Sequence, residues 1–226
     1  MTDHLRPFSG AIFDLDGTLL DSMGVWADID KEFLGRRGFD VPPDYMEAIT
    51  PLGFRGTALY TIDRFGLSDT PEGLMEEWST MAREKYAHEV MLKPGAEELL
   101  RELYEAGVPL AVVTASQPEL FLPCLKRNCI AGLFSLFLTT DGTGMTKNAP
   151  DIWKLAAEKM GLPPEKMVAF DDAAASVRGA KQAGLQTVGV YDPLSRGQDM
   201  LMEEADLYTE SLCRCSGLSA LCLLQK

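Results

Sequence analysis

The chain has 226 residues, of which 46% are hydrophobic, and its formal net charge is −13 at pH 7. This length can supply one hydrophobic core and a small second one, because domains usually contain about 100–200 residues. The excess of acidic side chains disfavours nucleic acid and an anionic membrane as partners. An anionic ligand must therefore be bound by a local cluster of groups.

The compartment is suggested by two further features of the sequence. No apolar run approaches the ~18 residues that a membrane span requires, and the N-terminus lacks the apolar segment of a secretion signal. We therefore expect a cytoplasmic protein without a membrane partner. The cysteines are odd in number and lack paired CxxC spacing, which favours reduced thiols; they are Cys124, Cys129, Cys213, Cys215 and Cys222.

The first predicted element is a short buried strand, "AIFDL", at 11–15. The sequence that follows, from about 23 to 90, has apolar residues three and four positions apart, a pattern that indicates amphipathic helices. These helices are predicted in "MGVWADIDKEFLGRR", "PDYMEAI", "GTALYTIDRFGL" and "PEGLMEEWSTMAREKYAHEV".

From residue 96 onward, helical and strand patterns alternate. Near-continuous apolar strands joined by helices of about ten residues predict a doubly wound parallel α/β sheet with helices on both faces. The helical insertion after the first strand predicts a cap domain over 23–91, with a core made of 1–22 and 92–226. The C-terminal segment 206–226 is expected to hold an edge strand and a short helix. The predicted helices are 96–106, 118–128, 150–160 and 174–183, and the predicted strands are 109–114, 136–140, 167–170 and 186–190.

Polar side chains lie where ligands bind in such a sheet, beyond the carboxyl ends of the strands. Like charges at ~4 Å and an effective dielectric constant near 20 repel by about 4 kcal/mol per pair, so one lysine cannot offset four carboxylates. A divalent cation with oxygen ligands can, and Mg²⁺ is the usual choice. The alternative is that each acid only caps a helix or stabilises a turn, which is less plausible for the whole set: Asp14, Asp16, Thr114, Lys147, Asp171 and Asp172.

Four segments, "FDLDGTLLDS", "VVTAS", "KNAPD" and "FDDAAAS", resemble the ordered motifs of the haloacid dehalogenase superfamily. The helical insertion resembles the cap of the branch that contains phosphoglycolate phosphatase and β-phosphoglucomutase. The resemblance implies a Rossmann-like core with an all-helical cap. It also implies phosphoryl transfer, with Asp14 as the nucleophile that forms an aspartyl phosphate. Asp16 would be the general acid and base, and its backbone carbonyl would contact the metal.

The resemblance also implies how phosphate and metal are bound. Thr114 and the backbone amides around Ala115 and Ser116 would hold phosphoryl oxygens, and Lys147 would neutralise the charge that phosphate shares with Asp14. The implied ligands of Mg²⁺ are Asp14, Asp16, Asp171 and Asp172. Glutamate is more frequent than aspartate at position 171 in this branch. Because the aspartate side chain is one methylene shorter, Asp171 is expected to reach the metal either directly or through a water molecule.

The expected function is Mg²⁺-dependent hydrolysis of a small phosphomonoester, such as a sugar phosphate or a phosphoglycolate-like metabolite. Arg55, in "PLGFRGT", is expected in an interhelical loop of the cap, where it would bind a carboxylate or second phosphate of the substrate or simply face solvent. One alternative is a phosphomutase, which Trp26 disfavours because β-phosphoglucomutases carry a histidine there. Another alternative is a catalytically silent module that binds a phosphorylated ligand. The sequence predicts no oligomeric state.

Overall fold

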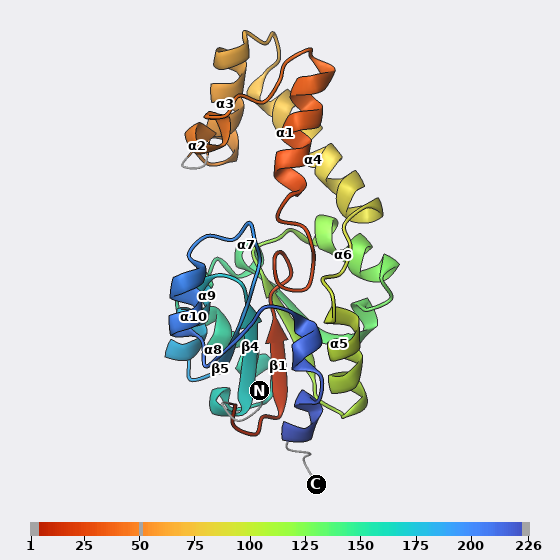
Figure 1. The fold of residues 1–226 in the computed structure, drawn as a ribbon, viewed down its shortest axis with the longest axis vertical. Helices are drawn as coiled ribbons and strands as arrows, with labels where there is room; N and C mark the ends of the chain where they lie inside the picture. The colour runs from red at the N-terminus through yellow and green to blue at the C-terminus, as the bar shows by residue number, and fades with distance from the viewer. Residues whose placement is uncertain (1–4, 50–51, 223–226) are drawn as a thin grey trace. The chain divides into compact units, whose positions relative to one another are not determined.

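The computed structural model describes residues 5–49 and 52–222 (Figure 1). These residues divide into two compact units. One unit is Gly24–Glu89, which we call the cap, and the other comprises the described residues on either side of it, which we call the core. The ends of the predicted core segments at 1–4 and 223–226 lie outside the described residues. Among the residues described, no helix is both long enough and apolar enough to cross a membrane.

The core contains a six-stranded sheet in the order β3-β2-β1-β4-β5-β6, in which every neighbouring pair is parallel. The prediction of a doubly wound parallel sheet is confirmed. The chain adds strands outward from β1 to β3 and then returns to place β4 on the other side of β1. The strand order therefore reverses between β1 and β4, which is where open α/β sheets bind ligands. The strands are β1 (Gly10–Phe13), β2 (Leu110–Thr114), β3 (Phe134–Thr139), β4 (Met167–Asp171), β5 (Gln186–Val190) and β6 (Leu207–Thr209).

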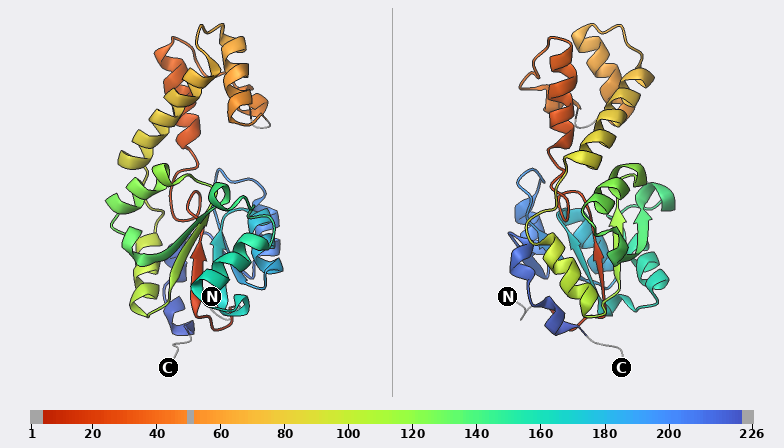
Figure 2. Two further views of the ribbon diagram at one scale, coloured as in Figure 1. Left: turned by 180° about the vertical axis from the view of Figure 1, so that it is seen from behind. Right: turned by 90° about the vertical axis from the view of Figure 1, so that its right-hand side faces the viewer.

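Helices α8 (Asp151–Met160) and α9 (Ala174–Gln182) cover one face of the sheet (Figure 2). Trp153 of α8 is fully buried there and belongs to the same apolar cluster as Ile12 of β1 and Ala169 of β4. Burial of such a side chain stabilises the fold by about 2–3 kcal/mol. This face therefore fixes both helices beside the two central strands.

Helices α5 (Ala96–Glu105) and α6 (Pro118–Arg127) connect strands on the other side of β1, and right-handed crossovers place them on the opposite face. An aromatic row fills this layer. The rings of Phe13 and Phe170 stack at 4.5 Å, and the rings of Phe121 in α6 and Phe137 stack at 5.8 Å. The Phe134 ring lies between them, 6.5 Å from Phe13 and 5.7 Å from Phe137.

Several element boundaries differ from those that the sequence predicts. β3 ends at Thr139, because the Thr139 hydroxyl accepts a hydrogen bond from the Gly142 backbone N–H at 3.0 Å and starts the short helix α7 (Thr140–Thr143). Helix α10 (Gln198–Glu204) was not predicted; it buries only Leu201, so its sequence carries little periodicity. The C-terminal edge strand is β6, and two 3₁₀ helices follow it in place of a single helix: η4 (Leu212–Cys215) and η5 (Leu218–Leu221). Two further 3₁₀ turns, η2 (Ala131–Leu133) and η3 (Pro164–Lys166), precede β3 and β4.

The two connections between core and cap pair with each other on the core side. Leu20 and Leu92 form an antiparallel bridge, and the Asp21 N–H donates to the Met91 carbonyl at 2.9 Å. The Lys93 N–H donates to the Leu19 carbonyl at 2.8 Å. The outgoing and returning segments are therefore held side by side where they leave the sheet.

The cap is helical throughout its described elements. The Thr70 hydroxyl accepts a hydrogen bond from the Gly73 N–H at 3.1 Å, and Pro71 occupies the first turn of α4, where a missing N–H costs nothing. The rings of Phe33 and Trp78 meet at 5.3 Å in the centre of this unit. The cap helices are α1 (Val25–Arg36), α2 (Tyr45–Ile49), α3 (Phe54–Phe65) and α4 (Pro71–His88).

Arg55 lies in the first turn of α3 and not in the interhelical loop that the sequence predicts. The helix begins two residues earlier than the apolar pattern indicates, after Gly53, whose φ of 30° few other residues adopt. Arg55 forms an ion pair with Glu72, and the two side chains are 60% and 65% exposed. An exposed pair of this kind contributes about 0–1 kcal/mol. The guanidinium therefore remains available to other anions.

Asp30 of α1 provides a test of the cap alone. Burial raises the pKa of this carboxyl to about 6. Since the folded pKa lies above the unfolded value, ionisation above pH 6 disfavours the folded cap, whereas the protonated acid at low pH does not. We expect Asp30→Asn to increase the free energy of unfolding by about 1 kcal/mol at pH 7.5, allowing for the partial access of the carboxyl to water, and by less at pH 5. Urea unfolding at both pH values measures this difference.

The exposed Asp28 of the same helix gives the matched control, Asp28→Asn, which should show no such gain at pH 7.5. An Asp30→Asn variant that is less stable than the parent protein at pH 7.5 would show that the ionised carboxylate stabilises the cap.

Candidate active site

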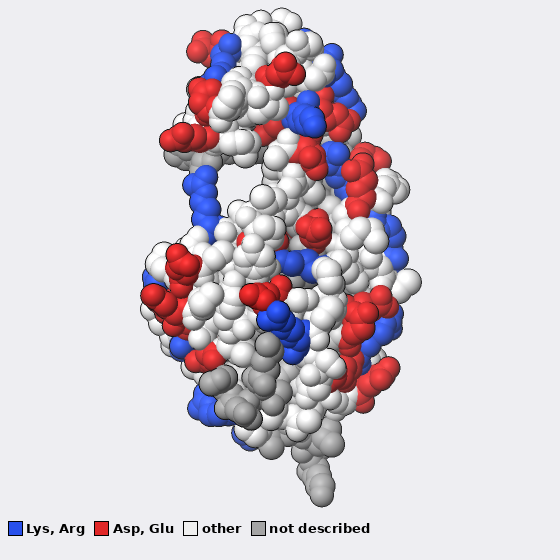
Figure 3. Space-filling view, in the orientation of Figure 1, with Lys and Arg blue, Asp and Glu red and all other residues white. Residues whose placement is uncertain are grey.

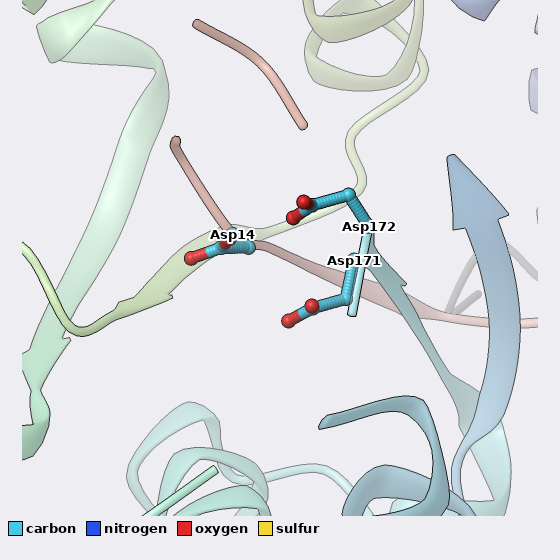
Figure 4. Close-up of side chains that lie close together, drawn as sticks. All are labelled: Asp14, Asp171 and Asp172. Carbon is cyan, nitrogen blue, oxygen red and sulfur yellow. The ribbon is translucent and has the colours of Figure 1, made fainter. Parts of the chain in front are cut away.

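The backbone ladder between β1 and β4 sets two aspartates level with each other. Phe13 pairs with Phe170, and the Asp14 N–H continues the ladder by donating to the Phe170 carbonyl at 3.0 Å. Asp171 is the last residue of β4, and Asp172 directly follows the strand. Figure 4 shows the three carboxylates directed to the same side of the sheet edge, and one oxygen of each lies within 4.8 Å of the others. All three residues are buried.

Lys147 is the cation of this site. Its Nζ lies 2.8 Å from Oδ1 of Asp14 and 2.9 Å from Oδ2 of Asp171. The lysine side chain is only 12% exposed. Burial alone would lower the pKa of Lys147, but the charges of Asp14 and Asp171 outweigh it and raise the pKa above its ordinary value. The ammonium therefore stays charged at physiological pH and joins the two strand ends electrostatically.

The loop that carries Lys147 is fixed by contacts that sequence reasoning missed. The Lys147 carbonyl accepts a hydrogen bond from Nε1 of the buried Trp153 at 2.9 Å. The same carbonyl approaches α9 so closely that a Cβ on Gly179 would lie 2.2 Å from its oxygen. The glycine in the middle of a helical pattern was the only available signal, since such a glycine often marks close backbone approach.

Gly179→Ala should therefore destabilise the core, although alanine is normally the better helix residue. The propensity gain is about 1 kcal/mol, whereas forcing a methyl group against a fixed backbone oxygen costs about 1–3 kcal/mol or more. We expect the free energy of unfolding to fall by about 2 kcal/mol, because the backbone at Lys147 must move away from the new methyl group. Urea unfolding measures this loss. In the control Gly35→Ala, in α1, the new Cβ meets nothing within 4 Å, so a small gain is expected. A stabilised Gly179→Ala protein would contradict the close approach.

Asp171 is held by protein donors on both oxygens. Its Oδ1 accepts from the Ala173 N–H at 3.0 Å, and its Oδ2 accepts from the Ser176 hydroxyl at 2.5 Å in addition to Lys147. No sequence motif pointed to Ser176 as a partner of Asp171. With both oxygens engaged, Asp171 is the least accessible of the three carboxylates.

Asp172 is contacted by hydroxyl groups from two other loops. Thr18, on the loop after β1, donates to Oδ1 at 3.2 Å, and Ser195, on the loop after β5, donates to Oδ2. The sequence pattern alone does not indicate these contacts of Thr18 and Ser195 with Asp172. Burial, followed by the charge of Asp171, raises the pKa of Asp172 to about 6.

The structure places the other predicted residues as follows. Asp16 accepts from the Ser22 hydroxyl at 2.6 Å, and its carboxylate is not part of the group formed by the other three aspartates. Thr114 is buried at the end of β2, next to β1 in the sheet, and its hydroxyl accepts from the Ser116 N–H at 3.0 Å. Ala115 lies between them in the bend that follows the strand. Arg55 belongs to the cap.

The donor set fits a hard divalent cation. Burial raises the pKa of Asp14 well above its usual value, with Lys147 acting against this change. Lys147 supplies one positive charge beside three buried carboxylates, and the pKa values of Asp14 and Asp172 are raised by burial first and by the neighbouring carboxylates second. Carboxylate oxygens are the ligands that Mg²⁺ prefers, and Mg²⁺ sites typically use one or two of them beside water and phosphate.

The profile of a family described as "haloacid dehalogenase-like hydrolase" matches residues 11–190. The chain is 30% identical over 203 residues to the "probable pseudouridine-5'-phosphatase" of Drosophila melanogaster, covering 84% of each protein. It is 29% identical over 214 residues to the phosphoglycolate phosphatase of Pseudomonas putida, covering 89% of this chain and 76% of that protein. The solved structure of a "putative beta-phosphoglucomutase" from Thermotoga maritima shares the fold, with a TM-score of 0.82, 23% identity, and coverage of 92% of this chain and 97% of that chain.

Proposed function

The chain belongs to the haloacid dehalogenase-like hydrolase family, and we propose that it is a Mg²⁺-dependent phosphatase that hydrolyses a small phosphomonoester. One observation carries the proposal: the buried Asp14 carboxylate lies beside Lys147 and within reach of two further carboxylates at the switch point of the sheet. The phosphatase names of the relatives from Drosophila melanogaster and Pseudomonas putida support hydrolysis of a phosphomonoester.

In the proposed reaction, a carboxylate oxygen of Asp14 attacks phosphorus. The new bond joins Asp14 to the phosphoryl group while the bond from phosphorus to the substrate's leaving oxygen breaks. A water molecule then attacks phosphorus, which releases inorganic phosphate and restores the Asp14 carboxylate. The contact between Lys147 and Oδ1 orients the carboxylate and leaves its other oxygen to react.

Asp16 moves the protons. As a carboxylic acid it donates a proton to the leaving alcohol, and as a carboxylate it then takes a proton from the attacking water. Its position two residues after the nucleophile places it on the same loop, where the Ser22 hydroxyl fixes one carboxylate oxygen.

In this proposal, the transferring phosphoryl group is bound by Thr114, Lys147 and the backbone amides of Ala115 and Ser116.

The surface charge of the protein does not itself attract phosphate. Figure 3 shows basic and acidic side chains interspersed over the face it displays. With a net charge of −13, the field of the whole protein does not attract anions, so these local donors must capture the phosphate. Charge stabilisation by fixed donors is the main contribution that a protein makes to phosphoryl transfer.

Mg²⁺ would be held by carboxylate oxygens of Asp14 and Asp172 and by the backbone carbonyl of Asp16, with Asp171, whose two oxygens also accept protein donors, acting directly or through water. When bound, it supplies positive charge that offsets the charge of the phosphoryl oxygens and the carboxylates. The leaving group is expected to be a small polar alcohol, as in a sugar phosphate or a phosphoglycolate-like metabolite, with Arg55 as a candidate contact for a second anionic group.

The test is release of inorganic phosphate from a panel of sugar phosphates, nucleoside monophosphates, glycerol phosphates and phosphoglycolate, with Mg²⁺ and with excess EDTA. We expect hydrolysis of several small esters with Mg²⁺ and loss of that activity with EDTA. Isomerised sugar phosphate without release of phosphate would show a phosphomutase. No turnover across the panel, together with calorimetric binding of a phosphomonoester, would show a silent binding module.

A further inference from the structure

Lys93 follows the second connection to the cap and makes three polar contacts with two different loops of the core. Its Nζ lies 2.7 Å from the Gly17 carbonyl, 2.6 Å from the Tyr191 carbonyl and 2.9 Å from Oδ2 of Asp192. The lysine side chain is 13% exposed and that of Asp192 is 2% exposed. Three acceptors match the three donors of an ammonium group.

The first loop held by Lys93 is the one that follows β1. Gly17 has a φ of 79° and lies against Asp172, since a Cβ on Gly17 would be 2.5 Å from Oδ2 of Asp172. The adjacent Thr18 donates its hydroxyl hydrogen to the other oxygen of Asp172 at 3.2 Å. By fixing the Gly17 carbonyl, Lys93 fixes the backbone that packs close to Oδ2 of Asp172 and carries the Thr18 hydroxyl to Oδ1.

The second loop held by Lys93 is the one that follows β5. Asp192, whose Oδ2 pairs with Lys93, uses Oδ1 to accept from the Leu194 N–H at 2.9 Å. The Asp192 carbonyl accepts from the Ser195 N–H at 3.2 Å. This turn presents the Ser195 hydroxyl to Oδ2 of Asp172. Lys93 is thus connected to Asp172 through both loops, although the two side chains make no direct hydrogen bond.

We propose that Lys93 is a positioning residue that fixes the direction of the Asp172 carboxylate toward the cation site through the loops at 17–18 and 192–195. The inference rests on the proposed function, in which Asp172 binds Mg²⁺. An isolated structural ion pair would need only Asp192, whereas Lys93 also holds one backbone carbonyl on each loop. Groups that orient metal ligands typically change metal affinity or activity by about 10–100-fold when they are removed.

The test compares Lys93→Met with the parent protein by calorimetric titration of Mg²⁺ and by steady-state kinetics. We expect the Kd for Mg²⁺ to rise about tenfold, at the lower end of the range for groups around metal ligands, with KM for the phosphomonoester unchanged at saturating Mg²⁺. The matched control is Lys181→Met, because Lys181 also binds one carbonyl, of Glu204, and one aspartate, Asp206. These partners lie at the end of α10 and just after it, not on the loops whose hydroxyls contact Asp172. A Kd for Lys93→Met within twofold of the parent value would overturn the proposal.

A metal-independent measurement separates this inference from the proposed function. Amide hydrogen exchange at Thr18 and Ser195 in Mg²⁺-free protein should become faster in Lys93→Met and remain unchanged in Lys181→Met. Unchanged exchange would overturn the role of Lys93 even if the enzyme hydrolyses phosphomonoesters. Faster exchange in a protein that hydrolyses none would support Lys93 and overturn only the proposed function.

Two further variants keep the test decisive if Lys93→Met does not fold. Asp192→Asn keeps the acceptor for the Leu194 N–H but removes the charge that pairs with Lys93, and we expect about a threefold rise in the Kd for Mg²⁺, below the usual range because the lysine still holds both carbonyls. Lys93→Arg keeps the charge, so its Kd should lie closer to the parent value than that of Asp192→Asn. The reverse order would contradict the proposal.

Discussion

Asp14→Asn is expected to reduce phosphomonoester hydrolysis by about 10⁴-fold or more, as removal of a nucleophile does in other enzymes. The amide has the shape of the carboxylate but cannot attack phosphorus. Because Asp14 is buried beside Asp171 and Asp172, removal of its negative charge also relieves repulsion, so the melting temperature should be unchanged or higher. Phosphate release at saturating Mg²⁺ and thermal unfolding measure the two effects.

The control for this variant is Asp199→Asn, on the exposed side of α10. It makes the same chemical change away from the carboxylate group and should leave turnover unaltered. An Asp14→Asn protein that is folded and retains more than a tenth of the parent turnover would show that another group receives the phosphoryl group.

Lys147→Met is expected to have the second largest effect, on both stability and turnover. The methionine fills the volume but leaves Asp14 and Asp171 without their cation, and removal of one partner from a buried ion pair costs about 3–5 kcal/mol. Burial raises the pKa of Asp14 well above its usual value, so the loss should be largest at neutral pH and should shrink as the pH falls and Asp14 becomes protonated, because the neutral carboxyl no longer needs a counter-charge. Turnover should fall about 10²–10³-fold, comparable with the loss of a key charge-stabilising donor.

Urea unfolding of Lys147→Met with and without Mg²⁺ tests the origin of the loss. Mg²⁺ should restore part of the stability, because it supplies the missing positive charge to the same carboxylates. Lys181→Met, which removes a lysine that is 38% exposed, should change stability by less than about 1 kcal/mol. A Lys147→Met protein as stable as the parent at pH 7.5 without Mg²⁺ would show that Lys147 is not the counter-charge.

The sheet could be predicted from the sequence because its central strands are continuous apolar runs flanked by helical patterns. The strand 186–190 agrees in both bounds with β5, and the predicted helix at 174–183 is one residue longer than α9. The approach of Asp14 to Asp171 and Asp172 at the switch point could also be predicted, since Asp14 directly follows β1, Asp171 ends β4 and Asp172 comes next. Local sequence was enough for the strands and helices, because each depends on residues within one segment. The meeting of the acids also follows from the parallel sheet, whose strands place their carboxyl ends at one edge.

The supporting contacts could not be predicted, because each joins segments that are far apart in the chain. Lys93 reaches Gly17 and Asp192, and Ser195 reaches Asp172, only because the loops after β1, β4 and β5 end at one edge of the sheet. The start of α3 at Phe54 was missed for a different reason: its first turn buries little, so the apolar pattern begins after the helix does.

The central claim, that Asp14 receives the phosphoryl group, is tested most directly by trapping the aspartyl phosphate. Protein quenched during turnover with Mg²⁺ and a phosphomonoester is treated with borohydride, which reduces an acyl phosphate to an alcohol, and the product is located by peptide mass spectrometry. We predict homoserine at position 14, present only when substrate was added. Turnover that continues while the reduced residue lies elsewhere, or while no residue is reduced, would contradict the account.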